Sequence, residues 1–160
     1  MRLTTKGRYA VTAMLDLAFH EGQGPITLAQ ISQRQGVSIS YLEQLFAKLR
    51  RCQLVNSVRG PGGGYSLASP PADISVVQIV EAVDDSMDAT SCLGQADCQQ
   101  GEMCLTHHLW SDLSDWLRQF LEGISLADLA SRRDIQGVHF RQDHHDGSDQ
   151  PPDDSLVRII

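Results

Sequence analysis

The 160-residue sequence has no apolar run of about eighteen residues, the length that a membrane-spanning helix needs. Its polar, charged first residues are not followed by the apolar segment of a secretory signal peptide. Aromatic residues make up only 6% of the chain, but 41% of the residues are hydrophobic, enough for a core. We therefore expect one domain of ordinary size or a small domain with an appendage, no membrane partner, and a reducing, cytoplasmic location in which thiols stay free.

The chain also lacks the sequence features of an enzyme. It has no nucleotide-binding G-x-x-x-x-G-K-[ST] motif, no paired carboxylates in an apolar setting and no nucleophile with a base beside it. We expect a protein that is not an enzyme. A small iron-sulfur or zinc protein that transfers electrons or hydrolyses a substrate is the alternative from another class.

Positive charge is scarce overall, and it is unevenly placed. The net charge at pH 7 is −7, yet residues 1–65 hold eight lysines and arginines against three acidic residues. Residues 66–160 hold the remaining five basic residues and seventeen acidic ones. Such an asymmetry favours an anionic partner, such as double-stranded DNA, for the first part of the chain.

Three amphipathic helices are predicted in this basic part. The first runs from a cap at Thr4 or Thr5 to about His20, and the second follows Thr27. After a tight turn at 35–37, Ser38 or Ser40 caps the third, I-S-Y-L-E-Q-L-F-A-K-L-R-R. Two helices joined by a turn with glycine, the second ending in basic residues, are typical of a helix-turn-helix motif.

A β-hairpin is predicted directly after the third helix. Residues 54–58 lead in, 65–67 lead out, and G-P-G-G-G at 60–64 forms the bend. A hairpin in this position is the wing of a winged helix-turn-helix, and Arg59 beside the small loop can approach a narrow minor groove. A nucleotide-phosphate loop is the weaker reading, because the strand-to-helix setting of such a loop is absent.

These elements predict which side chains contact DNA. The exposed start of the third helix carries side chains for base edges, in which Glu43 accepts a hydrogen bond from cytosine, repels phosphate and so discriminates between sites. The expected base-reading residues are Ser38, Ser40, Glu43 and Gln44. The expected phosphate-contacting residues are Lys6, Arg8, Tyr41, Lys48 and Arg51, with Arg59 in the minor groove.

Three of the four cysteines lie in one short segment. Cys92, Cys98 and Cys104 have the spacing C-x5-C-x5-C, and His107 follows at the start of a helix predicted for about 103–122. Cys104 and His107 are therefore expected on one helix face. The set suits a zinc ion or a 2Fe-2S cluster, and the wide spacing favours the cluster. The alternatives without a metal are disulfides or inert buried thiols. A disulfide is disfavoured because the fourth cysteine, Cys52, lies far away in a basic helix.

The rest of the chain completes a mainly α-helical protein. Asp73 or Ser75 caps a fourth helix, and the wide apolar face of the long fifth helix predicts a dimer seam, unless that face folds back on its own winged unit. A short helix after Ser125 precedes a polar acidic end. The expected divisions are a DNA-binding unit at 1–72, a ligand loop with dimerisation helices at 73–135 and a disordered tail at 136–160.

Four motifs together resemble the IscR family of bacterial iron-sulfur cluster regulators: M-R-L-T-T-K-G-R-Y-A-V-T-A-M-L-D at the start, S-Y-L-E-Q-L-F, V-R-G-P-G-G-G-Y and C-x5-C-x5-C-L-T-H. The likeness covers residues 1–135. It implies a winged helix-turn-helix homodimer joined through its long helix, with one 2Fe-2S cluster per chain. The cluster would come from the iron-sulfur assembly machinery. The ligands implied by the resemblance are Cys92, Cys98, Cys104 and His107, with His108 as a neighbour able to compete.

The same resemblance implies a transcriptional regulator whose cluster-loaded form represses genes for cluster assembly, and whose cluster-free form still binds a second class of DNA sites. A regulator of the same fold that senses nitric oxide or another signal is an alternative. A zinc-stabilised DNA-binding protein is another.

Overall fold

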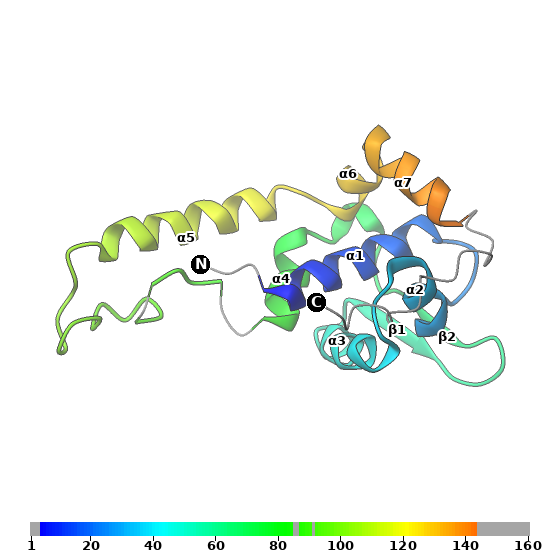
Figure 1. The fold of residues 1–160 in the computed structure, drawn as a ribbon, viewed down its shortest axis with the longest axis horizontal. Helices are drawn as coiled ribbons and strands as arrows, with labels where there is room; N and C mark the ends of the chain where they lie inside the picture. Colours follow the sequence, from blue (N-terminus) through cyan, green and yellow to red (C-terminus); the bar gives the residue numbers. More distant parts are fainter. Residues whose placement is uncertain (1–3, 85–86, 91, 144–160) are drawn as a thin grey trace, which may run out of the picture.

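The computed structural model describes residues 4–84, 87–90 and 92–143. Its first three helices confirm the predicted helix-turn-helix (Figure 1). Thr4 caps α1 (Thr5–Phe19), and Ser38 caps α3 (Ile39–Arg51) by accepting from the Tyr41 N–H. Thr27 forms a capping box with Gln30 at the start of α2 (Leu28–Gln35). Each cap satisfies N–H groups that a helix start leaves unpaired, so these starts follow from local sequence.

Helices α3 and α1 supply much of the hydrophobic core. The buried side chains of α3 repeat at spacings of three and four, which places them on one face, and they are Leu42, Leu45, Phe46 and Leu49. Helix α1 contributes Ala10, Ala13, Met14 and Leu17 to the same cluster. The helix predicted to read DNA is therefore packed against the core on one face, and its opposite face is exposed to solvent.

The wing is a two-stranded antiparallel sheet, as predicted. Strand β1 (Val55–Val58) pairs with β2 (Gly64–Leu67) in the register Val55↔Leu67 to Val58↔Gly64. Ile26 extends this sheet by one bridge, with its N–H 2.8 Å from the Tyr65 carbonyl oxygen. A Cβ on Gly64 would lie 2.5 Å from the Ile26 carbonyl oxygen, so this close approach requires glycine.

Helix α4 (Val76–Val83) follows a 3₁₀ turn, η1 (Pro71–Asp73), and begins with the predicted capping box of Ser75 and Gln78. It packs on α1 at Gly7, where a Cβ would come within 2.9 Å of Asp84 Oδ2. Ile79 and Val83 join the core formed by the winged unit. The boundary expected at residue 72 stays a prediction, and this shared core fixes α4 firmly to the helices before it.

Helix α5 (His107–Glu122) starts later than the sequence predicts. The expectation of a start near Met103 is wrong because Thr106 is the N-cap and the residues before it form turns. Cys104 therefore lies outside the helix, and it does not share a helix face with His107. Figure 1 shows α5 and the segment before it extending away from the winged unit as an arm.

After α5 the chain returns to the body of the protein, which is residues 4–83 together with α6 (Leu126–Ala130). Val76 N–H donates to Ile124 O (2.8 Å) and Leu126 N–H to Ile74 O (2.9 Å), which joins α6 to the start of α4. Leu126 is fully buried in the common core. The base of the arm is therefore anchored in the body.

The last described residues differ from expectation. Residues 136–143 were expected to belong to a disordered tail, but they form most of α7 (Arg133–Asp143). This helix is held by specific side-chain pairs, such as Gln142 with Gln35 of α2, and its apolar residues Val138 and Phe140 stay exposed. The rest of the expected tail, with His144 and His145, lies outside the described residues.

Across the part of the chain that the structure describes, no helix is both long enough and apolar enough to cross a membrane.

Candidate metal centre and nucleic-acid interface

Most of the segment that carries the three cysteines has irregular backbone, and it depends on left-handed conformations. Gly94 and Gly101, which lie between the cysteines, have φ angles of +80° and +87°. A Cβ on Gly94 would lie 3.2 Å from Asp88 Oδ2. A short bridge between Gln99 and Glu102, with N–O distances of 2.9 and 2.8 Å, closes the turn before Cys104. The segment is therefore a structured loop although it contains no long helix or strand.

Two thiols of this loop point at one histidine. The Sγ atoms of Cys92 and Cys98 lie 3.5 and 3.4 Å from Nδ1 of His107. One ligand atom from each of the three residues falls within 4.8 Å of the others. His107 is 7% exposed, whereas His108 is exposed and touches it only ring to ring, with centroids 5.8 Å apart. Of the two histidines, the structure brings His107 to the thiols, with Nδ1 as the facing atom.

Cys104 lies at the edge of this group. Its Sγ is 3.8 Å from the Thr106 hydroxyl, and its thiol also hydrogen-bonds with Cys98. That bond, with help from the Thr106 N–H at the start of α5, lowers the pKa of Cys104. Cys104 is thus close to the group of Cys92, Cys98 and His107 without belonging to its tightest part.

Thr90 organises the loop, and the sequence analysis did not single it out. Its buried hydroxyl accepts from the Gly94 N–H (2.8 Å) and donates to Asp88 Oδ1 (2.7 Å). The Ala89 N–H donates to the Ser114 hydroxyl of α5 (2.8 Å), which attaches this end of the loop to the helix. The signal for Thr90 was weak, since it was only a polar residue two positions before a cysteine in a loop with glycines.

These contacts affect the charge on the thiols. Partial desolvation raises the pKa of Cys92, but hydrogen bonds from Thr90, Cys98 and the N–H groups of Ala96 and Gly94 outweigh it and lower the pKa to about 6. The pKa of Cys98 is raised: the Cys104 N–H opposes this, but desolvation and the two neighbouring thiols prevail. The loop therefore favours thiolate at Cys92, and thiolate is the form that binds metals.

The donor set fits either kind of metal centre considered from the sequence. Three thiols and an imidazole are four ligands, the number that both a structural zinc ion and a 2Fe-2S cluster use. A cluster is wider than a single ion. The position of Cys104, bonded to Cys98 but outside the tightest group, fits the wider object.

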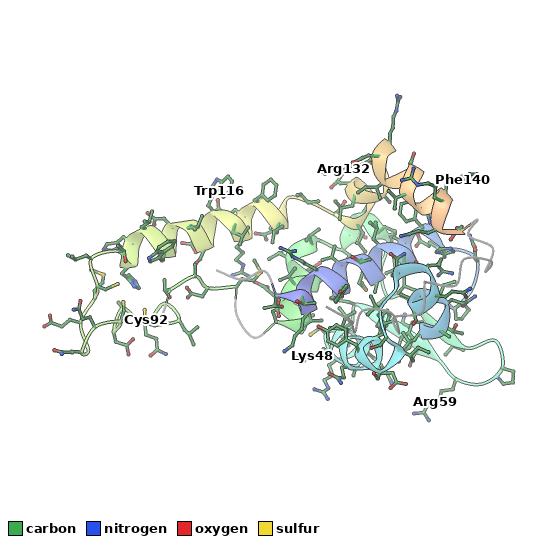
Figure 2. The ribbon with its side chains drawn as sticks, viewed as in Figure 1. Lys48, Arg59, Cys92, Trp116, Arg132 and Phe140 are labelled. Atoms are coloured by element: carbon green, nitrogen blue, oxygen red, sulfur yellow. The ribbon has the colours of Figure 1, made fainter. Side chains whose placement is uncertain are left out.

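The predicted DNA-reading residues lie where the sequence placed them. Ser40, Glu43 and Gln44 are exposed on α3, and the exposed Ser38 uses its hydroxyl as the helix cap. Arg51 at the end of α3 and Arg59 on the wing are also exposed, and Figure 2 shows Arg59 pointing away from the body. Lys6 and Arg8 are exposed at the start of α1.

Two of the residues predicted to contact phosphate have partners inside the protein. The Lys48 ammonium donates to the Val83 carbonyl at the C-terminal end of α4 (2.9 Å). Tyr41 makes an edge-to-face contact with Tyr9, with ring centroids 5.8 Å apart. These contacts fasten α3 to α4 and to α1. For Lys48 and Tyr41 the structure shows a positioning contact, and the phosphate contact stays a prediction.

Helix α5 presents a row of exposed apolar side chains. Trp116 is 64% exposed and stacks on Phe120 with ring centroids 5.9 Å apart, and Leu109 and Trp110 continue the row. Figure 2 shows Trp116 on the side of α5 that faces away from the body. The alternative that this face folds back on its own winged unit is wrong for these side chains. Such a row is too apolar to be an ordinary solvated helix face.

Comparison with known families gives one match over most of the chain. Residues 3–132 match the family model Rrf2, described as an iron-dependent transcriptional regulator. The match spans the winged unit, the cysteine loop, α5 and α6.

Individual relatives agree with this match. The HTH-type transcriptional regulator IscR of Sodalis glossinidius is 58% identical over 144 residues, which cover 90% of this chain and 87% of that protein. The solved structure of T. potens IscR has a TM-score of 0.66 at 40% identity, covering 81% of this chain and 85% of that one. The structure of CymR, the global cysteine regulator of B. subtilis, has a TM-score of 0.70 at 35% identity, covering 82% and 97%.

Proposed function

The chain belongs to the Rrf2 family of iron-dependent transcriptional regulators, and from this premise we propose that it senses iron-sulfur cluster status through a 2Fe-2S cluster. In this proposal Cys92, Cys98, Cys104 and His107 hold one cluster per chain. The cluster-loaded dimer represses genes for cluster assembly, so loss of the cluster raises the synthesis of new clusters. The observation that carries the proposal is the convergence of two thiols on His107 Nδ1, with the third thiol beside Cys98.

The fold alone does not indicate which signal the protein senses. CymR, a named cysteine regulator, superposes on this chain at least as well as T. potens IscR does. The cysteine loop therefore carries the argument for a cluster, together with the 58% identity to an IscR. The three thiols and the imidazole of this loop are donors that suit iron. The loop that carries them also contains glycines in left-handed conformations, which a packed helix would not need.

A histidine among the ligands has a physical consequence. Imidazole is neutral where a fourth thiolate would carry a negative charge, and its nitrogen must be free of a proton to bind. We therefore expect a weaker and more pH-dependent hold than four cysteines would give. The cluster, when bound, supplies a link between the loop and α5 that iron shortage or oxidants remove. A weakly bound cluster suits a protein that senses how much iron-sulfur cluster is available.

The contacts at the end of α4 offer a route from the loop to the DNA-binding helices. Val83 accepts from Lys48 of α3, and Asp84 accepts a hydrogen bond from the Thr4 hydroxyl at the start of α1. The loop's anchoring residues, from Asp88 to Thr90, follow within a few positions. On the arm's side, Arg118 of α5 pairs with Glu81 of α4 at 3.1 Å. A change of order in the loop would thus reach the C-terminal end of α4, which contacts both α1 and α3.

We further propose that the protein acts as a homodimer joined through α5. A second copy would cover the apolar row of Leu109, Trp110, Trp116 and Phe120 and would place two recognition helices on one duplex. Double-stranded DNA is then contacted by Ser40, Glu43 and Gln44 at base edges, with Ser38 at the cap. Lys6, Arg8, Tyr41, Lys48 and Arg51 lie near the phosphates and Arg59 at the minor groove.

The test is anaerobic purification followed by a visible spectrum and analysis of iron, sulfide and zinc. Wild type, Cys92→Ala and Cys52→Ala are compared, because Cys52 is an exposed thiol at the end of α3, outside the loop. We expect two irons and two sulfides per chain in wild type and in Cys52→Ala, and a colourless Cys92→Ala. A colourless wild type with one zinc per chain would overturn the cluster and make the loop a structural zinc site. Equal cluster content in all three proteins would overturn the ligand assignment.

A further inference from the structure

A second group of possible metal ligands lies far from the cysteine loop, where α7 meets α1. It consists of His20, the residue that ends α1, and of His139 and Asp143 on α7. One ligand atom from each falls within 4.8 Å of the others. His139 and Asp143 are four residues apart on one helix and so share a face. We propose that these three residues form a site for a divalent transition-metal ion such as zinc, which clamps α7 to the DNA-binding unit.

The distances fit a shared ion better than hydrogen bonds between the side chains. Nε2 of His20 lies 3.3 Å from Asp143 Oδ1, and Nε2 of His139 lies 3.3 Å from Asp143 Oδ2. Charge-assisted hydrogen bonds of this type are shorter, about 2.7–2.9 Å. Ligands about 2.0–2.1 Å from a tetrahedral zinc ion are separated by roughly 3.3–3.4 Å, the edge of that tetrahedron. Each imidazole Nε2 therefore lies about one ligand–ligand edge from an oxygen of Asp143, His20 from Oδ1 and His139 from Oδ2.

The ring of His20 is held with the correct nitrogen free. Its Nδ1 lies 2.7 Å from the Asp16 backbone carbonyl oxygen, which can only accept, so Nδ1 carries the proton and donates. In the neutral ring this leaves a lone pair on Nε2, directed at Asp143. A backbone carbonyl on the distal nitrogen is the usual support of a metal-bound histidine. His20 is only 6% exposed, so this arrangement is fixed by burial.

The ring of His139 is fixed in another way. It stacks on Phe19 with centroids 4.1 Å apart and planes 7° from parallel, and it meets the His20 ring edge to face at 5.2 Å. Phe19 and His20 are neighbours at the end of α1, so one short stretch orients both imidazoles. The His139 and Asp143 side chains are 23% and 29% exposed, which leaves room for water as a fourth ligand. A cavity of about 330 Å³, lined in part by Val11, Phe19 and Val138, reaches the ring of His139.

The charges around the site are compatible with a cation. Arg34 is the nearest positive group, with Nε 3.9 Å from Asp143 Oδ1, but its two shorter bonds, of 2.9 and 2.6 Å, go to the carboxylate of Asp16. Asp16 is 3% exposed, and Gln35 also donates to it at 2.8 Å. Arg34 is therefore engaged mainly by Asp16, and each oxygen of Asp143 faces one imidazole. Two nitrogens and one carboxylate oxygen favour zinc and similar ions over magnesium, which prefers oxygen ligands.

An occupied site would matter because of what α7 touches. Gln142 bonds to Gln35 at 3.0 Å, so α7 contacts the first helix of the helix-turn-helix as well as α1. Figure 1 shows α7 beside the end of α1, on the body and away from the arm. An ion bound only when α7 is docked would stabilise the docked form, and this stabilisation would rise with the logarithm of the ion concentration once that exceeds the dissociation constant.

The test measures zinc binding to the full-length chain carrying Cys92→Ser, Cys98→Ser and Cys104→Ser, so that thiols of the loop hold no zinc. Competition with a coloured chelator gives stoichiometry and affinity, and His139→Ala and Asp143→Asn are then added separately. The double change His144→Ala with His145→Ala is the control for unspecific binding by neighbouring histidines. The melting temperature of each protein is measured with and without zinc.

We expect saturable binding of one zinc per chain in the parent and in the control, with a higher melting temperature when zinc is present and little response to magnesium. Affinity should fall more than about 100-fold in His139→Ala and Asp143→Asn, because even changes behind the ligands cost 10–100-fold. The zinc-dependent shift in melting temperature should disappear in the same two variants. Unchanged affinity in both variants, loss of binding in the control or no saturable binding in the parent would each overturn the proposal. None of these results bears on the cluster, because the loop thiols are absent throughout.

Discussion

The body of the protein and its arm are stabilised in different ways. The body, residues 4–83 with α6, buries an apolar cluster built from helices, the wing and Leu126. In the arm, the described residues from 87 to 122 have two buried side chains, Thr90 and His107, and both are polar. The body therefore folds by apolar burial, as ordinary domains do. The arm depends on hydrogen bonds and on what binds to it, which is suitable for a region that must respond to a signal.

The largest effect that separates the two regions is expected for Phe46→Ala. Phe46 is fully buried beside Tyr65, so its truncation should lower the free energy of unfolding by about 3–5 kcal/mol. Leu105→Ala in the fully exposed part of the arm is the control, and it should change this free energy by less than about 0.5 kcal/mol. Urea denaturation followed by circular dichroism measures both. Similar losses in the two variants would mean that the arm contributes to the same cooperative core.

The next effect concerns what covers the arm. Trp116→Glu puts a charge in the apolar row of α5, so we expect the dimer dissociation constant to rise more than about 30-fold, the cost of losing an interface residue worth at least 2 kcal/mol. Sedimentation equilibrium measures this constant. Asp115→Asn, an exposed polar change on the same helix, should leave it unchanged. A Trp116→Glu protein that dimerises as well as wild type would place the interface elsewhere.

A smaller effect is expected within the loop, at Thr90. With a pKa of about 6, Cys92 in the cluster-free protein is mostly thiolate above that pH, so its alkylation rate should rise with pH through about 6. Thr90→Val removes a hydrogen bond that lowers this pKa, and the midpoint should move to higher pH. Mass spectrometry of Cys92 alkylation against pH tests this, with Cys52 as the internal reference for an exposed thiol. An unchanged midpoint would show that Cys98 and the backbone N–H groups of Ala96 and Gly94 set it without Thr90.

The smallest effect is expected at the wing of the body. Arg59→Ala should weaken DNA binding and reduce the slope of log affinity against log salt by about one. Arg132→Ala is the matched control, because this exposed arginine lies between α6 and α7, away from the wing in Figure 2. Fluorescence anisotropy over a salt series measures both slopes. Equal slopes for wild type and Arg59→Ala would remove Arg59 from the DNA contacts.

The features that the sequence predicted well are local ones. The caps at Thr4, Thr27, Ser38 and Ser75 depend on residues within three positions, so the sequence is enough to find them. The hairpin follows from its run of glycines in the same way. The start of α5 was placed too early because turns before Thr106, fixed by the loop's own bonds, decide where that helix begins.

The candidate sites depended on the sequence to different extents. Cys92, Cys98 and His107 are within one segment, so their meeting could be predicted, although the role of Thr90 beneath them could not. The group of His20, His139 and Asp143 left no such signal. Its members come from opposite ends of the described chain, and residues 136–143 are too polar to have suggested a packed helix.

The sequence by itself determined the winged helix-turn-helix, the family and the supply of thiols, because periodicity, caps and motif spacing act over short distances along the chain. Only the tertiary structure decided that His107 faces the thiols, that Lys48 is tied to the end of α4, and that α7 docks beside His20. These are contacts between segments that the chain brings together only when the apolar core forms. Their geometry depends on the packing of all the helices at once, which no local pattern encodes.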